Sequence, residues 1–320
     1  MTTIIPTLTG EKAVADLGRT LVHEHVFVLG EEYRQNYQTD WNETEMVGNA
    51  IADLNELKAL GIDTIMDPTV LGLGRYIPRL QRIAAHTNLN IIVATGLYTF
   101  SDVPLQFHYS GPGLLFDVPE PLTKLFIKDL TEGIADTGVR AAFLKCAIDD
   151  HGLTPGVERV LRATGRASAE TGAPITVHTH AASRSGLVAQ QILRDEGADL
   201  GRVIIGHSGD TEDLDYLSEL ADAGSLLGMD RFGLDTFLPF ENRIDTVVAM
   251  VERGYTDRLV LSHDASCFMD LFDQDAKREL LPKWNFRHIS EDVLPALRDR
   301  GVTEAQIASM LIENPRRYFE

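Results

Sequence analysis

The chain has 320 residues, 44% of them hydrophobic, and its 29 basic and 48 acidic residues give a formal net charge of −19. This charge argues against nucleic acid or an anionic membrane as a partner and favours a small neutral substrate. Two cysteines, no signal-peptide pattern at the start and no apolar run near the ~20 residues of a membrane span predict a soluble protein of the reducing cytoplasm.

Short apolar runs alternate with longer amphipathic stretches along the chain. Residues 1–18 are predicted to form a hairpin that closes one end of the fold. Eight strands are predicted at 20–25, 62–67, 90–95, 141–147, 174–178, 202–207, 225–230 and 258–263. Helices are predicted at 43–60, 76–86, 119–136, 157–171, 186–196, 211–223, 243–253 and 291–300. Asp210 is expected to begin the sixth helix, and Gly172 to end the fourth.

The order of these elements predicts the fold class. Runs such as IIVAT and VIIGH are nearly all hydrophobic, which is typical of parallel strands covered on both faces. Eight alternating strand–helix units predict a (β/α)8 TIM barrel. Because no linker or low-complexity segment interrupts the pattern, residues 1–320 are expected to form a single domain. Two long connections, 98–118 and 265–287, follow strands at the end where barrel enzymes carry their sites, and each could be a lid or a dimer surface.

Polar side chains recur at the same ends of the predicted strands. His23 and His25 are two residues apart on the first strand, so both point to one face. The other candidates near strand ends are Lys145, His178, His207 and Asp264. A single histidine at a strand end is more often structural, and this is the interpretation for His86, His108, His151, His263 and His288, while His180 stays open. The joint pattern predicts a metal site.

Lys145 decides how many ions are expected. An ammonium group in an apolar strand, beside imidazoles and a cation, is costly to bury. Reaction of the amine with carbon dioxide gives a carbamate, which reverses the charge and supplies two oxygens that can bridge two ions. The alternative is a lysine paired with a buried carboxylate. Cys146 alternates away from Lys145 and is expected to pack outward against the helices.

The ordered motifs resemble those of a known family. They are VHEH, FLKCA, PITVHTH, IIGHSGD and LSHDASC, together with DPTVLGLGR, GLYTF, GMDRFG and ENPRRYF. Their order over essentially the whole chain resembles the phosphotriesterase family of the amidohydrolase superfamily. Within that family the chain is most similar to the phosphotriesterase-like lactonases, and among these to actinobacterial-type enzymes that open N-acyl-homoserine lactones.

The resemblance implies roles for individual residues. His23, His25 and Asp264 would hold the more buried of two divalent ions, and His178 and His207 the more exposed one. Carboxylated Lys145 and a hydroxide would bridge the ions, with zinc expected first and iron, cobalt or manganese also compatible with these donors. The predicted catalytic residues are Asp264, as proton acceptor and donor, Tyr98, which leans over the site, and Arg231, which shapes the pocket. Glu24 points away from the ions by alternation and is expected to be structural.

The resemblance also implies a function. The expected activity is that of a lactonase, a carboxylic ester hydrolase acting in quorum quenching by attack of the bridging hydroxide, with promiscuous phosphotriesterase activity and a homodimeric assembly. A primary phosphotriesterase (aryldialkylphosphatase) or another ester hydrolase is the main alternative. A mononuclear amidohydrolase such as a deaminase, and a non-catalytic lactone-binding protein, are the others. Ala265, Ser266 and Leu271 differ from the lactonase pattern and are expected on the acyl side of the pocket, so the preferred chain length stays open.

Overall fold

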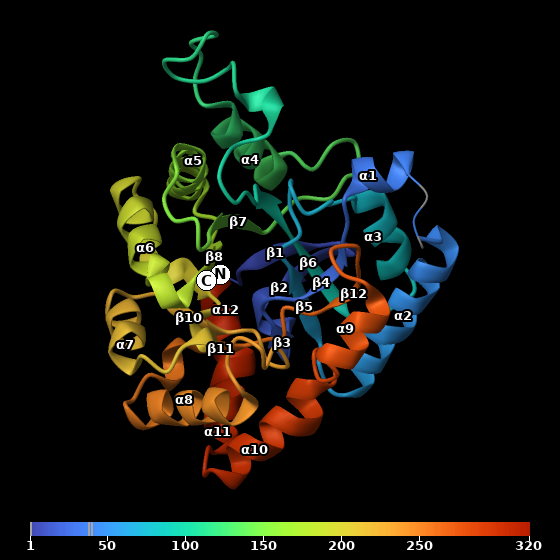
Figure 1. The fold of residues 1–320 in the computed structure, drawn as a ribbon, viewed down its shortest axis with the longest axis vertical. Coiled ribbons are helices and arrows are strands. Elements are labelled where there is room, and N and C mark those ends of the chain that lie inside the picture. The colour runs from blue at the N-terminus through green and yellow to red at the C-terminus, as the bar shows by residue number, and fades with distance from the viewer. Residues whose placement is uncertain (1, 38, 40) are drawn as a thin grey trace.

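Eight parallel strands form the central sheet of the computed structural model, which describes all residues except 1, 38 and 40. Each strand lies beside its neighbours in sequence, in the order β11-β10-β9-β8-β7-β6-β5-β3 (Figure 1). Their bounds are β3 (Thr20–Leu21), β5 (Thr64–Asp67), β6 (Asn90–Gly96), β7 (Phe143–Ile148), β8 (Ile175–Thr179), β9 (Val203–Gly206), β10 (Leu226–Met229) and β11 (Leu259–Leu261). All eight strands lie within or beside their predicted ranges, so the predicted barrel is confirmed.

The first and last strands meet and close the sheet. Short extensions, β4 (His25–Val28) and β12 (Ser266–Met269), pair in parallel with Ser266 opposite His25. Just before this pair, the Asp264 amide donates to the His23 carbonyl over 3.0 Å. The predicted first strand is therefore interrupted after Leu21 and resumes at His25, which brings two of the candidate ligand segments into direct backbone contact.

Helices pack against the barrel, most of them on its outer side, while α12 packs at the end where the strands begin (Figure 1). They are α1 (Glu31–Asn36), α2 (Glu43–Ala59), α3 (Ile77–Ala84), α4 (Pro121–Thr131), α5 (Pro155–Thr171), α6 (Ser185–Asp195), α7 (Leu214–Asp222), α8 (Phe240–Glu252), α9 (Gln274–Leu280), α10 (Leu294–Asp299), α11 (Glu304–Ala308) and α12 (Asn314–Phe319). A π-helical turn at Ile289–Val293 leads directly into α10. No helix within the described residues is both long and apolar enough to cross a membrane.

Local chemistry explains where individual helices begin and end. The Thr154 hydroxyl caps α5 by accepting from the Val157 amide, and Gly172 ends the helix in the left-handed conformation, as predicted. The predicted start of α7 is wrong. Asp213 caps it by accepting from the Tyr216 amide, whereas the Asp210 carboxylate is engaged by Arg243 over 2.7 Å. Either aspartate could cap a helix, but Asp210 is engaged in the ion pair with Arg243, so the helix begins after Asp213.

The interior of the barrel changes character from one end to the other. Apolar side chains fill the end where the strands begin: Ile5, Val22, Met66, Ile92, Phe143, Ile204, Leu226, Val260 and Tyr318. The strands β1 (Ile4–Thr7) and β2 (Gly10–Ala13) form an antiparallel hairpin there, and the Leu8 amide donates to the Ile91 carbonyl over 3.0 Å. At the opposite end of the barrel interior, where the strands end, the side chains are polar.

Candidate metal centre

Strand alternation carries Lys145 into the barrel. In β7, Phe143 belongs to the apolar plug of the interior, while Leu144 and Cys146 belong to the larger core between sheet and helices. Lys145 therefore points inward, one step nearer than Phe143 to the carboxyl ends of the strands, and only 1% of its surface is exposed. Cys146 packs outward, as predicted.

The predicted ligands of the first and last strands converge on this lysine. Lys145 Nζ lies 3.1 Å from His23 Nε2. Asp264 Oδ1 lies 3.4 Å from the same His23 nitrogen and 3.3 Å from His25 Nε2. Donor atoms of residues 23, 25, 145 and 264 thus gather at one point, although the residues are spread over more than two thirds of the chain.

Two further histidines complete the group. His178 Nδ1 and His207 Nε2 face each other at 2.8 Å, and His207 Nε2 lies 3.9 Å from Asp264 Oδ2. Ligand atoms of His23, His207 and Asp264 all lie within 4.8 Å of one another, close enough to share one ion. All six predicted ligands are therefore brought together, and their coordination of metal stays a prediction.

The outer ring nitrogen of each histidine has a hydrogen-bond partner, and His23 and His207 share one. Asp230 lies 2.9 Å from His23 Nδ1 through Oδ2 and 3.0 Å from His207 Nδ1 through Oδ1. Thr69 Oγ1 lies 2.7 Å from His25 Nδ1, and Asp149 Oδ2 lies 2.6 Å from His178 Nε2. Carboxylates accept hydrogen bonds, so the nitrogens facing Asp230 and Asp149 carry the proton. Such partners are typical behind metal-bound histidines.

This arrangement tests whether the residues fit a metal. Because the outer nitrogens of His178 and His207 donate to carboxylates, their inner nitrogens, 2.8 Å apart, both present lone pairs. Two lone pairs at that separation repel each other unless a cation lies beside them. The donor set of imidazole nitrogens, a carboxylate and an amine that can become a carbamate therefore fits divalent transition ions.

Burial sets the protonation of the centre. Desolvation lowers the pKa of His178 to about 4, and that of His207 well below its usual value, so both rings are neutral at pH 7. Desolvation also lowers the pKa of Lys145 to about 8, which leaves part of the amine neutral and nucleophilic at pH 7. Burial alone would raise the pKa of Asp264, but the neighbouring His23 and His25 hold it well below its usual range.

Two of the predicted ligands adopt left-handed backbone conformations. His207 has φ of 62° and Asp264 has φ of 54°. A non-glycine residue in this region costs of order 1–3 kcal/mol and persists only where its surroundings impose it. His207 directly follows β9, and Asp264 lies in the short link between β11 and β12, so the turn that carries each side chain toward the barrel axis is held against local preference.

Tyr98 and Arg231 also reach the centre. The Tyr98 ring packs edge-on against His178, with ring centres 5.1 Å apart, and its hydroxyl donates to Asp149 over 3.4 Å. Arg231 Nε donates to Asp264 Oδ2 over 3.1 Å, and its Nη1 donates to Asp210 over 3.0 Å. Both residues therefore lie at the site, each touching a predicted ligand or its partner.

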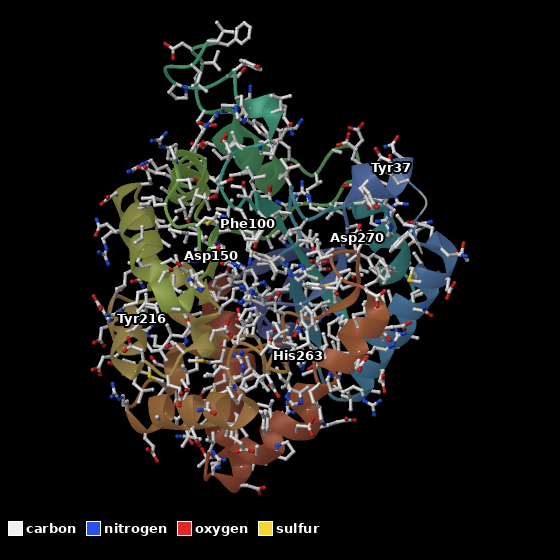
Figure 2. All side chains as sticks on the ribbon, in the orientation of Figure 1. Tyr37, Phe100, Asp150, Tyr216, His263 and Asp270 are labelled. Atoms are coloured by element: carbon white, nitrogen blue, oxygen red, sulfur yellow. The ribbon has the colours of Figure 1, made fainter. Side chains whose placement is uncertain are left out.

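A cavity of about 400 Å³ opens above the centre. His23, His25, Lys145, His178 and Asp264 form part of its lining, and the apolar part comprises Val28, Leu73, Phe100, Leu234, Phe237, Met269, Leu271, Phe272, Leu281 and Trp284. Figure 2 shows Phe100 and Asp150 beside each other on the segments that follow β6 and β7. The Phe100 ring contacts that of His151 with centres 5.5 Å apart.

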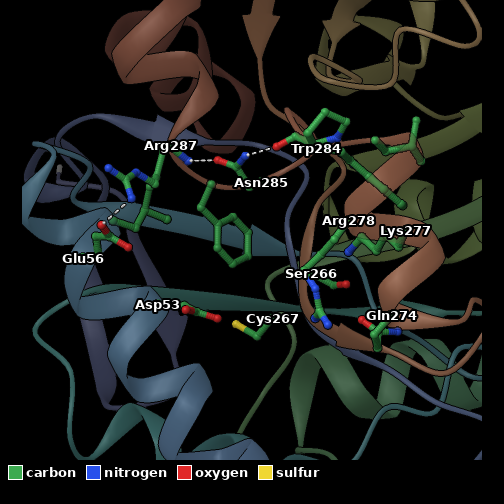
Figure 3. Close-up of a pocket in the computed structure, with 14 residues that line it drawn as sticks. Asp53, Glu56, Ser266, Cys267, Gln274, Lys277, Arg278, Trp284, Asn285 and Arg287 are labelled. Atoms are coloured by element: carbon green, nitrogen blue, oxygen red, sulfur yellow. Dashed lines mark hydrogen bonds and ion pairs between the residues drawn. The ribbon is translucent and has the colours of Figure 1, made fainter.

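One expectation about this cavity is wrong. Leu271 lines it, but Ala265 is buried in the core and Ser266 turns away. Ser266 lines a separate cavity of about 560 Å³ between α2 and α9, shared with Asp53, Cys267 and Lys277 (Figure 3).

Sequence reasoning missed the residues that support the histidines. Asp67 ends β5, Asp149 follows β7 and Asp230 follows β10, all at the end of the barrel that carries the ligands. An aspartate at the carboxyl end of a predicted strand was therefore the sequence signal from which these supporting residues could have been predicted. Glu24 is structural, as expected: it binds Ser262 and His263. His180 lies outside the cavity lining.

Fold and site together define a parallel (β/α)8 barrel with a candidate metal centre at the carboxyl ends of its strands. The sequence model of the phosphotriesterase family matches residues 4–319, and the chain belongs to that family. A Mycobacterium tuberculosis protein named phosphotriesterase homology protein is 56% identical over 98% of this chain and 97% of its own length. An aryldialkylphosphatase of Saccharolobus solfataricus is 40% identical over 95% of both chains. A solved structure described as the phosphotriesterase from Mycobacterium tuberculosis has a TM-score of 0.98 and 55% identity, covering 99% of this chain and 98% of the other.

Proposed function

We propose that this phosphotriesterase-family hydrolase is a metal-dependent lactonase that opens N-acyl-homoserine lactones and related lactones, with weaker phosphotriesterase activity. The observation that carries the proposal is the position of the converging donors directly beneath an apolar cavity. A neutral ester with an apolar tail matches both parts of this site. In cells the same reaction would remove acyl-homoserine lactone signals, which is quorum quenching.

The residues divide into two halves that would hold one ion each. The inner half is His23, His25 and Asp264, and the outer half is His178 and His207, with Lys145 between them as a carbamate. Zinc is the ion we expect, and iron, cobalt or manganese would suit the same donors. When bound, two divalent ions would lower the pKa of a water molecule and polarise the ester carbonyl.

The protein's own groups would orient the ester and move the proton. Asp264 Oδ2 is held by Arg231, while Oδ1 faces the inner histidines, so the carboxylate has one fixed orientation. From there it would accept the proton released on attack and pass it to the leaving alkoxide. The Tyr98 hydroxyl lies at the edge of the site beside His178 and would donate to the developing negative charge.

The apolar wall supports an acyl substrate in particular. Leu271 and Phe272, from the segment after β12, are 62% and 53% exposed and line the cavity with Phe237. An acyl chain laid against them would gain roughly 0.8 kcal/mol per buried methylene, or about fourfold in kcat/KM for each. The small neutral headgroup needs no further cationic pocket.

A primary phosphotriesterase is the second candidate. The observation that favours it is the 40% identity to a protein named aryldialkylphosphatase. A phosphotriester is also neutral and presents a polarised P=O group to the same centre. The two candidates differ in what the apolar wall contributes, because a dialkyl aryl phosphate has no long chain to bury.

The test compares kcat/KM for a series of N-acyl-homoserine lactones with kcat/KM for paraoxon. The zinc-loaded protein should favour the lactones by orders of magnitude, with rates that increase as the acyl chain lengthens. Leu271→Ser should flatten this chain-length dependence and leave paraoxon turnover nearly unchanged, and Leu280→Ser, an exposed position outside the cavity, is the matched control. A preference for paraoxon by orders of magnitude would overturn the assignment.

We also propose a homodimer. The segment between β6 and α4 projects from the barrel (Figure 1) and exposes apolar side chains, including Leu105, Tyr109, Leu115 and Phe116. A second copy that covers them would remove a large apolar surface from water. Analytical ultracentrifugation of Leu115→Glu against the unchanged chain tests this, and a monomeric unchanged chain would refute it.

A further inference from the structure

Asp230 is the only side chain among the described residues that accepts hydrogen bonds from a histidine of each half of the centre. Its Oδ2 faces His23 Nδ1 at 2.9 Å, and its Oδ1 faces His207 Nδ1 at 3.0 Å. Oδ1 also accepts from the His207 backbone amide over 2.7 Å. The three donors together use both oxygens of one carboxylate.

The carboxylate is held in a space shaped for it. Asp230 is 0% exposed, and within the described residues its side chain forms hydrogen bonds and ion pairs with His23 and His207 alone. A β-carbon at Gly228 would lie 2.5 Å from Oδ2, and one at Gly206 would lie 3.3 Å from it. The group fits because both positions lack a side chain, so it has little freedom to rotate for one histidine without disturbing the other.

The other supporting groups each serve one half. Asp149 bonds His178 of the outer half, and its side chain is 18% exposed at the cavity. Thr69 bonds His25 of the inner half and donates its hydroxyl to Asp67. Neither reaches across the centre. The structure therefore contains one shared support and two separate ones.

We propose that Asp230 couples the two ion-binding halves, so that the first ion bound prepares the site for the second. The proposal rests on the proposed two-ion centre. An ion that engages His23 fixes the plane of that ring and its Nδ1 proton, which fixes the Asp230 carboxylate. The carboxylate in turn fixes His207, so the second ion no longer has to order that ring. Asp230 is in this sense a positioning residue that touches no ion itself.

The test is a titration of the metal-free protein with Co²⁺ at constant bicarbonate, followed by visible absorption and by metal analysis per chain. Constant bicarbonate keeps any coupling through a Lys145 carbamate equal in all samples. The unchanged protein should bind two ions with a Hill coefficient above 1. Asp230→Asn offers an acceptor to only one of the two ring N–H groups, so binding to the half that loses its acceptor should weaken by roughly tenfold to a hundredfold. The other binding step should weaken because it loses the gain from coupling, and cooperativity should fall.

Asp149→Asn is the matched control, because it makes the same chemical change behind one histidine of the outer half. It should weaken one binding step by a similar factor and leave the other unchanged. Circular dichroism melts report folding, and if Asp230→Asn does not fold, Asp230→Ser, which leaves room for a water between the imidazoles, replaces it.

Three results would overturn the coupling: independent binding of two ions by the unchanged protein, a single weakened step in the Asp230 variant, or cooperativity that survives in it. Binding of only one ion per chain by the unchanged protein would instead refute the two-ion centre itself. Because the titration uses no substrate, its result on coupling stays valid even if the protein is not a lactonase.

Discussion

Glu24 and His263 are joined by a hydrogen bond of 2.6 Å between Oε1 and Nδ1, and both side chains are completely buried. The same carboxylate accepts from the Ser262 hydroxyl and from the backbone amides of His263 and Ala265. Glu24 thus fastens the first strand of the barrel to the last, on the opposite side of the chain from the neighbouring ligands His23 and His25.

Glu24→Gln should therefore destabilise the fold without removing a ligand. The amide NH₂ would face donors that now have a carboxylate, and each buried donor left without a partner costs about 1–3 kcal/mol. We expect a loss of about 2–4 kcal/mol in the free energy of unfolding by urea denaturation. Glu279→Gln, at an exposed position of α9, is the control and should change it by less than about 0.5 kcal/mol.

Metal content separates this role from a catalytic one. The folded fraction of Glu24→Gln should bind as many ions per chain as the unchanged protein. If Glu24→Gln were as stable as the unchanged protein but bound fewer ions, Glu24 would support metal binding and not the closure of the barrel.

Lys145→Met should remove the proposed carbamate bridge between the two halves. Methionine matches the length of the lysine stem and suits the buried position, so the fold should persist. We expect at least one ion to be lost and lactone turnover to fall by roughly two orders of magnitude or more. Cys146→Ala, the adjacent residue that packs outside the barrel, should keep both ions.

The carbamate can be observed directly. After incubation with ¹³C-bicarbonate and zinc, the unchanged protein should show a carbamate carbon resonance by NMR, and Lys145→Met should not. A two-ion protein without this resonance would refute carboxylation of Lys145.

Strand alternation was enough to predict most of the centre. It places Lys145 inside and Cys146 outside, and the common end of parallel strands gathers His178, His207 and Asp264. The bond from Asp230 to two histidines could not be predicted, because it depends on rotamers and on space left by Gly206 and Gly228. A sequence pattern predicts the face of a strand on which a side chain lies, but it does not predict which distant groups share one carboxylate.

Acidification should destabilise the metal-free protein between pH 6.5 and about 4. Burial lowers the pKa of His178 to about 4 from 6.5, so in this range the unfolded chain binds more protons than the folded one. Stability therefore falls as the pH falls, and His178 alone contributes about 3 kcal/mol across the range. Urea denaturation at a series of pH values measures the slope.

His178→Asn isolates the contribution of His178, because asparagine cannot be protonated in this pH range. Its stability should decline less steeply than that of the unchanged protein over the same pH range. Equal slopes for the two proteins would show that His178 does not carry the effect.

Asp264→Asn should abolish turnover and spare the fold. The carboxylate lies at the meeting point of His23, His25 and Arg231, and an amide there can neither accept the proton from water nor deliver one to the alkoxide. We expect kcat for an acyl-homoserine lactone to fall by roughly 10²–10⁴, with the melting temperature of the metal-free chain nearly unchanged.

Because asparagine is also a weaker metal ligand than aspartate, metal content is measured on the same samples, and turnover is compared at saturating zinc. Asp270→Asn, directly after β12 and outside the cavity lining, is the matched control and should retain full activity. Activity of Asp264→Asn close to that of the unchanged protein at full metal occupancy would assign the proton transfer to another group, and Asp149, which lines the same cavity, would be the next to replace.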